Sequence, residues 1–167
     1  MIRKATTADA QAICEIYNYY VLHTIITFEE EAVNVKEMEE RIRVVILKYP
    51  WFVYEENGEV IGYAYCGEWK SRCAYRYSVE SSIYLKNGIS GRGIGSRLYE
   101  ALFSALKNTD IHGVIGGISL PNEASIALHE KFGFHKIGQF KEVGFKFNYW
   151  IDVGYWERIM NNKIPKS

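Results

Sequence analysis

Residues 77–120 constrain the fold of this chain more than any other part of the sequence. Residues 77–85 alternate between an apolar face and a polar face that carries Glu80 in mid-strand, which is the period of a β-strand. From Gly93 the apolar residues recur at helical spacing, and residues 114–120 return to a β-branched strand pattern. The segment is therefore predicted to be a strand, a glycine-rich loop, a helix and a second strand.

Two helices and a hairpin are expected before this unit. Residues 2–4 fit a first strand, and Thr7 is expected to cap the following helix. Asn34, with Glu37 three residues later, predicts the start of a second helix that ends near Tyr49, before a proline. Aromatic and β-branched segments at 51–55 and 59–69 meet at Asn-Gly, residues 57 and 58, which predicts an antiparallel hairpin.

The end of the chain completes the fold class. Residues 122–132 have a helical pattern that stops at Gly133, and residues 134–160 contain two further strand segments. This order predicts an α/β (α+β) single domain over residues 1–160, with a mixed, mostly antiparallel central sheet flanked by helices. Residues 161–167 are expected to form a C-terminal tail.

Composition narrows the function. Twenty basic residues balance twenty acidic ones, so no global charge favours nucleic acid or an anionic membrane as a partner. No stretch approaches the roughly 18 apolar residues of a membrane-spanning helix. The chain opens without an apolar signal segment, and its three cysteines are an odd number without a CxxC pair, which predicts a cytoplasmic protein. Scattered His and Cys residues predict no metal site.

The glycine-rich loop at residues 88–95 is the motif that carries chemistry. Glycines let backbone N–H groups close on a ligand, and the start of a helix adds partial positive charge, so the loop favours a phosphate or pyrophosphate. An ordinary flexible turn is the alternative. Ser96 stands where a dinucleotide-binding motif has its last glycine, and no Gly-Lys-Ser/Thr ending marks an ATP-binding loop.

Longer matches connect this loop with a known family. Residues 91–95, Gly-Arg-Gly-Ile-Gly, follow the strand as in motif A of the GNAT N-acetyltransferase superfamily, although Ser90 stands where that motif commonly has Gln or Arg. The chain resembles the phosphinothricin N-acetyltransferase branch in consistent order from residue 2 to residue 160. The matching segments are residues 49–51, 67–75, 79–85, 120–122, 128–130 and 152–156.

This resemblance implies a GNAT-like domain that uses acetyl-CoA as co-substrate and forms a homodimer with substrate pockets near the interface. The residues implied to bind acetyl-CoA are Ile83, Tyr84 and Leu85 on the strand, Gly91, Arg92, Gly93, Ile94, Gly95 and Ser96 in the loop, and Asn122, which would bind the pantetheine arm. Glycines at 116 and 117 would permit close approach to a strand, or would mark a bulge.

Two residues are candidates for acid–base chemistry. An α-amino group with a pKa of about 8 is mostly protonated at neutral pH and must lose a proton before it attacks a thioester. Glu80 is the first candidate for the general base, against the alternative of a solvated strand carboxylate. His129 is the second, because the resemblance places histidine where other GNAT proteins have a tyrosine acid, against the alternative of a structural histidine.

An acceptor with carboxylate or phosphinate oxygens requires cationic partners. Lys70, Arg72 and Arg76 form a basic cluster before the Glu80 strand, although a solvated basic loop has the same composition. Phe28 and Tyr77 are the aromatic candidates for the wall of the acceptor pocket.

The predicted function is transfer of acetyl, by direct attack, to the primary amine of an amino-acid-like acceptor of the phosphinothricin, methionine sulfoximine or methionine sulfone type. Two alternatives stay open at this point. One is an N-acetyltransferase for a protein N-terminus or a polyamine, for which residues 29–31, Glu-Glu-Glu, would offer acidic groups. The other is a non-catalytic sensor that binds acyl-CoA.

Overall fold

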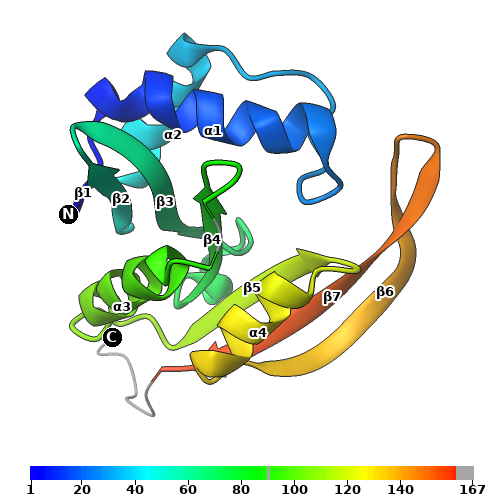
Figure 1. The fold of residues 1–167 in the computed structure, drawn as a ribbon. Helices are drawn as coiled ribbons and strands as arrows, with labels where there is room; N and C mark the ends of the chain where they lie inside the picture. The colour runs from blue at the N-terminus through cyan, green and yellow to red at the C-terminus, as the bar shows by residue number, and fades with distance from the viewer. Residues whose placement is uncertain (90, 161–167) are drawn as a thin grey trace.

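Within residues 1–89 and 91–160, which the computed structural model describes, the strands form a seven-stranded sheet with helices on both faces (Figure 1). The strand order is β1-β2-β3-β4-β5-β7-β6, with bounds β1 (Ile2–Lys4), β2 (Trp51–Glu56), β3 (Glu59–Glu68), β4 (Ser78–Leu85), β5 (Gly113–Ser119), β6 (His135–Lys146) and β7 (Tyr149–Ile159). The helices are α1 (Ala10–His23), α2 (Val35–Val45), α3 (Ile94–Leu106) and α4 (Glu123–Lys131), with 3-10 turns η1 (Thr7–Asp9) and η2 (Cys73–Tyr75).

The predicted sheet type is confirmed. Neighbouring strands are antiparallel throughout this sheet except for β4 and β5, which run parallel. A strand that crosses to a parallel neighbour needs a long connection, and α3 supplies it here. Two segments named in the sequence analysis, Ser90 and the tail at 161–167, lie outside the described residues.

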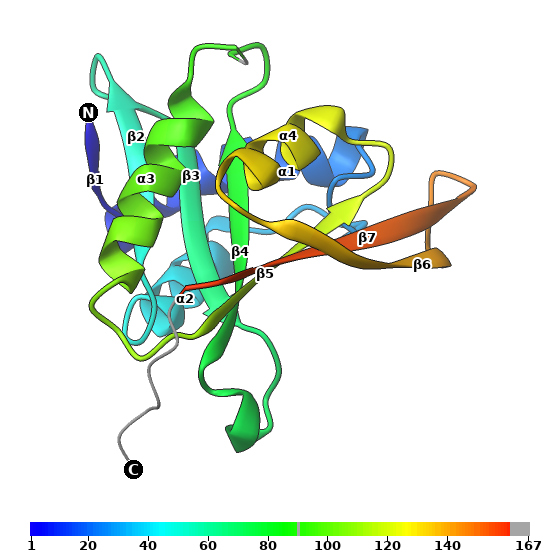
Figure 2. The same ribbon diagram turned by 90° about the horizontal axis from the view of Figure 1, so that it is seen from below.

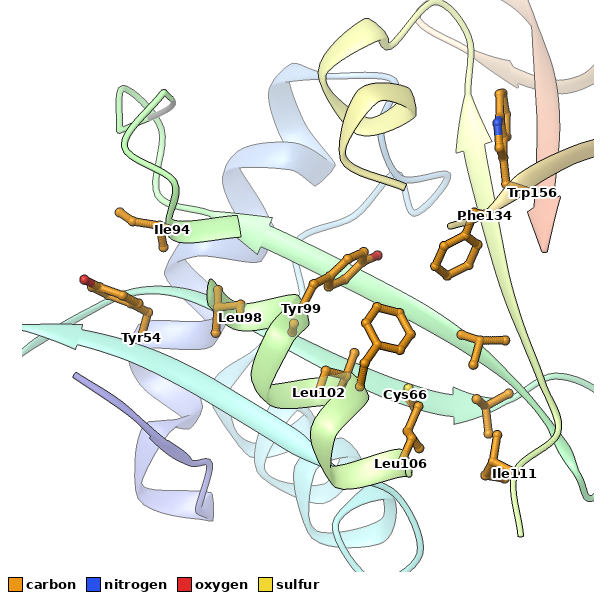
Figure 3. Close-up of a cluster of buried hydrophobic side chains, with 14 of the residues drawn as sticks. Tyr54, Cys66, Ile94, Leu98, Tyr99, Leu102, Leu106, Ile111, Phe134 and Trp156 are labelled. Atoms are coloured by element: carbon orange, nitrogen blue, oxygen red, sulfur yellow. The ribbon is translucent and has the colours of Figure 1, made fainter. Parts of the chain in front are cut away.

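Two apolar cores hold the helices against the sheet. On one face, α1 and α2 bury Ile13, Val21 and Ile42 against β2 and β3. On the other face, Leu98 and Leu102 of α3 pack into a second core that extends to β5 and β7 (Figure 3). The helical spacing read from the sequence after Gly93 therefore corresponds to the buried face of α3.

Several local signals act as predicted. The side-chain oxygen of Asn34 accepts a hydrogen bond from the Glu37 N–H at 2.9 Å, which caps α2. Asn57 and Gly58 both have positive φ, 53° and 80°, as a two-residue turn between antiparallel strands requires. Asn122, which was predicted to be the first residue of a helix, instead caps α4 by accepting a hydrogen bond from the Ser125 N–H at 3.1 Å.

Two predicted helix boundaries are wrong by a few residues. The first helical turn is capped at Thr6 rather than Thr7, because the Asp9 carboxylate accepts a hydrogen bond from the Thr6 N–H at 2.8 Å. Asp9 is also fixed by Arg3. The α2 helix ends at Val45 rather than near Tyr49, and the last residues before the proline form a turn instead.

The sheet opens at its one parallel pair. β4 and β5 are paired only at Ser78, Val79 and Glu80. Beyond Glu80, β4 stays paired with β3 as far as Leu85, while β5 stays paired with β7 as far as Ser119. Figure 2 shows the two strands diverging from this point. The divergence leaves room between two strands at the centre of the sheet.

α4 packs over this opening at Gly116 of β5. A Cβ on Gly116 would lie 2.6 Å from Nε2 of His129, which is held between the rings of Tyr99 and Phe134. The glycine is therefore required by close contact between a helix and a strand rather than by a bulge.

We predict that Gly116→Ala lowers the free energy of unfolding by about 1–3 kcal/mol, because the added methyl group overpacks against the His129 ring. Urea denaturation measures the effect. The matched control is Gly138→Ala in β6, where a Cβ would meet no atom within 4 Å. Equal stability of the two variants would contradict the packing argument.

Candidate active site

One face of the sheet around the opening lines a cavity of about 500 Å³, which we call the Glu80 cavity. Because side chains alternate along a strand, the residues of β4 and β5 that share the face of Glu80 appear together in its lining. The lining residues from the sheet are Glu80, Ser82, Tyr84, Gly117, Ser119, Val153 and Tyr155. The residues that cover the cavity are Ile26, Thr27, Phe28 and Glu30 from the loop after α1 and Val143, Gly144 and Phe145 from β6.

Two further hollows continue from this cavity along the opening. A cleft of about 50 Å³ lies between the diverging strands and shares Ser82, Tyr84 and Ser119 with the Glu80 cavity. A groove of about 270 Å³ then runs toward the glycine-rich loop, lined by residues that include Ile83, Leu85, Gly88, Gly95 and Asn122. The three hollows form a path from the start of α3 to Glu80.

The glycine-rich loop has the geometry of an anion site. Gly91 and Gly93 have positive φ, 82° and 73°, and a Cβ on either would meet no atom within 4 Å. Gly93 is the N-cap of α3, so the positive end of the helix dipole faces the loop. The backbone here is open to a ligand, as the phosphate-binding prediction requires.

The structure also places the other predicted loop residues. Arg92 forms an ion pair with Glu56 of β2, with distances of 2.7 and 2.9 Å to the two carboxylate oxygens. Ile94 is buried in the core of α3. The Ser96 hydroxyl accepts a hydrogen bond from Lys131 Nζ at 2.9 Å. The side chains of Arg92 and Ser96 thus have partners within the protein, and the open backbone is left for the anion.

Glu80 lies where the paired part of β4 ends and the opening begins. Its Oε1 is 3.1 Å from the position that a Cβ on Gly117 would take, so the glycine makes room for the carboxylate. Among the described residues the Glu80 carboxylate has no recorded hydrogen bond or ion pair, and burial raises its pKa above the ordinary value. A carboxylate of raised pKa facing a cavity suits a general base.

His129 occupies a different environment from that of Glu80. Its side chain is only 3% exposed and lines the strand cleft. Nδ1 lies 2.7 Å from the Ser125 carbonyl oxygen and donates to it, which leaves Nε2 to accept from the Tyr99 hydroxyl at 3.0 Å. Burial lowers the pKa of His129, so the imidazole is neutral at neutral pH. Its catalytic role stays a prediction.

The predicted acceptor residues are distributed unevenly. Phe28 lines the Glu80 cavity and packs against Gly144. Lys70, Arg72 and Arg76 are exposed in the connection from β3 to β4 and do not line this cavity. Tyr77, also outside it, lies under the Arg76 guanidinium at 4.5 Å. The structure therefore brings Phe28 to Glu80 within one chain, while the roles of the basic cluster and Tyr77 stay predictions.

Sequence reasoning missed several residues of the site. Tyr155, Ser119 and Gly144 line the Glu80 cavity, and Tyr99 connects Ser81 to His129. Strand alternation provided a signal for Ser119 and Tyr155. Ser119 is paired with Val153 and Tyr155 with Gly117, and paired residues lie on the same face of the sheet. No short-range signal identifies Gly144, because its contact with Phe28 joins distant parts of the chain.

A separate cavity of about 420 Å³ lies beside α2, with Met38, Arg41, Trp51 and Tyr65 in its lining. It includes neither Glu80 nor any residue of the glycine-rich loop. A single reaction centre must join the anion site to a proton acceptor, so we place the candidate active site along the opening of the sheet.

Residues 1–89 and 91–160 contain no cluster of three or more His, Cys, Asp or Glu side chains that could hold a metal ion. None of the helices in this part of the chain combines the length and apolar character needed to cross a membrane.

Comparison with known proteins identifies the class to which this fold and site belong. The family model for the acetyltransferase (GNAT) domain matches residues 2–154, and the chain belongs to this family. It is 38% identical, over 98% of its length and 90% of the relative, to a phosphinothricin N-acetyltransferase of Streptomyces viridochromogenes. An L-methionine sulfoximine/L-methionine sulfone acetyltransferase of Salmonella typhimurium is 39% identical over 93% of this chain and 92% of the relative.

A solved structure supports the same assignment. The fold matches an acetyltransferase from Salmonella typhimurium, solved with acetyl-CoA, at a TM-score of 0.95 and 36% sequence identity. The match covers 99% of this chain and 96% of that one. The predicted family and the GNAT-like fold are therefore confirmed.

We predict that Glu80 lowers the stability of the native state as the pH rises. Its pKa is raised on folding, so the native state retains the proton at pH values where the unfolded chain has lost it. The contribution of protonated Glu80 to stability is complete at pH values below the pKa that Glu80 has in the unfolded chain. It is lost as the pH rises through the pKa that Glu80 has in the folded protein. Urea denaturation from about pH 4 to about pH 8 should show Glu80→Gln gaining stability relative to the wild type. A constant difference would mean that the pKa is not raised.

Proposed function

We propose that this protein is an acetyl-CoA-dependent N-acetyltransferase for the primary amine of a small amino-acid-like acceptor. Phosphinothricin, methionine sulfoximine and methionine sulfone are the acceptors that the names of its relatives suggest. The observation that carries the proposal is the Glu80 carboxylate, which has no recorded partner within residues 1–89 and 91–160, has a raised pKa and stands where the Glu80 cavity meets the opening of the sheet.

The residues along the opening fit acetyl-CoA. The backbone at Gly91 and Gly93 is open to a pyrophosphate, and the groove lined by Ile83, Leu85 and Asn122 suits an extended arm. Asn122 uses its side-chain oxygen to cap α4, so its amide nitrogen is the group left to donate to that arm. When bound, acetyl-CoA would supply an activated acyl group as a thioester.

The protein's own part in transfer is to bind, orient and deprotonate the acceptor. Glu80 accepts a proton from the ammonium group, directly or through water, and the neutral amine then attacks the acetyl carbonyl carbon. The bond from nitrogen to the carbonyl carbon forms, the bond from carbon to sulfur breaks, and the proton that the attacking nitrogen loses passes to the departing thiolate, which leaves as a free thiol. Direct attack is supported by the cysteines, since Cys14 and Cys66 are buried with raised pKa values and Cys73 lies in the exposed connection from β3 to β4.

The polyamine alternative has less support in the site. Of the acidic residues 29–31, Glu29 is bound by Arg41 at 2.7 and 3.1 Å and also accepts a hydrogen bond from Tyr17. Glu30 lines the Glu80 cavity. A second cationic end of a polyamine would thus find one free carboxylate rather than an acidic pocket.

We predict that Glu80→Gln reduces turnover at neutral pH by roughly a hundredfold to ten-thousandfold, the usual contribution of a general base. Release of free thiol with a panel of phosphinothricin, methionine sulfoximine, methionine sulfone and a polyamine measures transfer, and mass spectrometry identifies the acetylated product. Affinity for acetyl-CoA, measured by calorimetry, should stay unchanged because the carboxylate lies beyond the loop groove.

The control is Glu30→Gln, which removes another carboxylate from the lining of the same cavity. It should retain turnover. Turnover at the wild-type rate in Glu80→Gln would exclude the general-base role. If the wild-type protein binds acetyl-CoA but releases no thiol with any of the acceptors, the sensor alternative would be favoured.

We further propose a homodimer formed through the β6–β7 hairpin. The large apolar side chains exposed along this hairpin are Ile137, Phe140, Val143, Phe145, Phe147, Tyr149 and Trp150, with Ile159 at the far end of β7. An accumulation of exposed apolar side chains of this kind is typical of a protein interface. Val143 and Phe145 also line the Glu80 cavity, so a second copy bound here would lie beside the acceptor.

The free cysteines also support a cytoplasmic location, where thiols stay reduced.

We predict that Trp150→Glu shifts the protein from dimer to monomer, because a charge replaces an aromatic side chain that is 64% exposed in the isolated chain. Size-exclusion chromatography with light scattering measures the change. Leu47→Glu, at an apolar residue that is 75% exposed away from the hairpin, is the control and should remain dimeric. A monomeric wild type would contradict the proposal.

A further inference from the structure

The side chain of Lys146, at the end of β6, is buried with only 2% of its surface exposed. Its Nζ donates a hydrogen bond to the backbone carbonyl oxygen of Thr27 at 2.8 Å. Among the described residues the Lys146 ammonium forms no ion pair. Burial lowers the pKa of Lys146, and the more distant carboxylates of Glu29 and Glu30 act in the opposite direction by favouring the protonated form. A buried ammonium without a close carboxylate is unfavourable, so its presence calls for an explanation.

The carbonyl that Lys146 binds belongs to residues 26–30, the part of the loop after α1 that contributes Ile26, Thr27, Phe28 and Glu30 to the Glu80 cavity. The other recorded side-chain hydrogen bonds of this segment come from α1, from Thr24 directly after it, from α2 and from Tyr84 of β4. Tyr17 bonds with Thr27 at 2.8 Å and with Glu29 at 2.9 Å, and Arg41 binds Glu29. Within the described chain, Lys146 is the side chain whose recorded hydrogen bond ties this segment to the C-terminal strands.

An apolar contact lies beside this hydrogen bond. The Phe28 ring fits against Gly144 so closely that a Cβ there would lie 2.1 Å from a ring carbon. Gly144 and Lys146 are two residues apart on β6 and therefore face the same side of the strand. The segment thus rests against β6 through one polar and one apolar contact.

These two contacts determine the shape of the acceptor pocket. Residues 26–30 and residues 143–145 cover the Glu80 cavity above the sheet, and they come from distant parts of the chain. If the segment moved away from β6, the cavity would widen on the side away from Glu80. The glycine-rich loop and Glu80 would remain in place, since neither contacts Lys146.

We propose that Lys146 is a positioning residue that fixes residues 26–30 against β6 and so sets the affinity for the acceptor. The inference rests on the proposed function in that it takes the Glu80 cavity as the acceptor pocket. A charge-assisted hydrogen bond to a carbonyl is stronger than a neutral one, which accounts for a lysine at a place where burial opposes its charge.

The test replaces the ammonium in two variants. Lys146→Met has no group that can donate to the Thr27 carbonyl, and the side chain in Lys146→Gln is too short to reach it. Replacement of a buried charge by an apolar side chain is often neutral or stabilising, so Lys146→Met is expected to fold. Lys141→Met, at an exposed position on the same strand, is the matched control. Hydrogen–deuterium exchange of residues 26–30 is measured without any ligand, and acceptor KM, kcat and acetyl-CoA affinity are measured separately.

We expect exchange in residues 26–30 to accelerate and acceptor KM to rise about tenfold or more, with kcat and acetyl-CoA affinity within about twofold. The control should match the wild type. Unchanged exchange in a folded Lys146 variant, or an equal change of KM in Lys141→Met, would overturn the proposal. A purely structural lysine would alter thermal stability without this selective rise of KM. If no acceptor is acetylated, the proposed function fails, while the exchange measurement still decides whether Lys146 holds the segment.

Discussion

The end of parallel pairing at Glu80 is the constraint on which the rest of this structure depends. β4 and β5 share three paired positions and then follow different partners, β3 and β7. In a continuous sheet, the inner edges of both strands would bond to each other and leave no space for a ligand. Because they part in mid-sheet, the glycine-rich loop at one end of the opening and the carboxylate at the other can serve one elongated molecule.

Strand alternation converts this opening into a site with two different sides. Ser81, on the α3 side, lies 3.4 Å from the Tyr99 hydroxyl and close to the buried histidine. Glu80, on the other side, faces the cavity. The two acid–base candidates are therefore separated by the sheet itself. Glu80 has a raised pKa and lies beside the acceptor space, whereas His129 is neutral and hydrogen-bonded at both nitrogens, so the geometry favours Glu80 as the group that takes the proton.

Interactions between near neighbours could be predicted from the sequence, and interactions between distant residues could not. The Asn57-Gly58 turn and the Asn34 cap each depend on a few consecutive residues, and both were predicted correctly. The glycine-rich loop and the mid-strand position of Glu80 also followed from local patterns, and the family match supplied their expected roles. The contact of Lys146 with Thr27 spans 119 positions. Since lysine is rarely buried, nothing in its local sequence distinguishes Lys146 from a solvated lysine. Likewise, the pairing of Arg92 with Glu56 depends on β2 lying near the loop.

Two charged side chains, Glu80 in the lining of the cavity and Lys146 bound to a segment that covers it, have environments that oppose their charges. Burial raises the pKa of Glu80 and lowers that of Lys146, and each shift means that folding disfavours the ionised form. Neither group forms an ion pair among the described residues, although Lys146 has the Thr27 carbonyl as a partner. A sequence optimised for stability alone would pair or replace both. Their presence is consistent with function: Glu80, in the lining of the cavity and without a recorded partner among the described residues, can accept a proton, and the Lys146 ammonium holds a segment that covers the pocket.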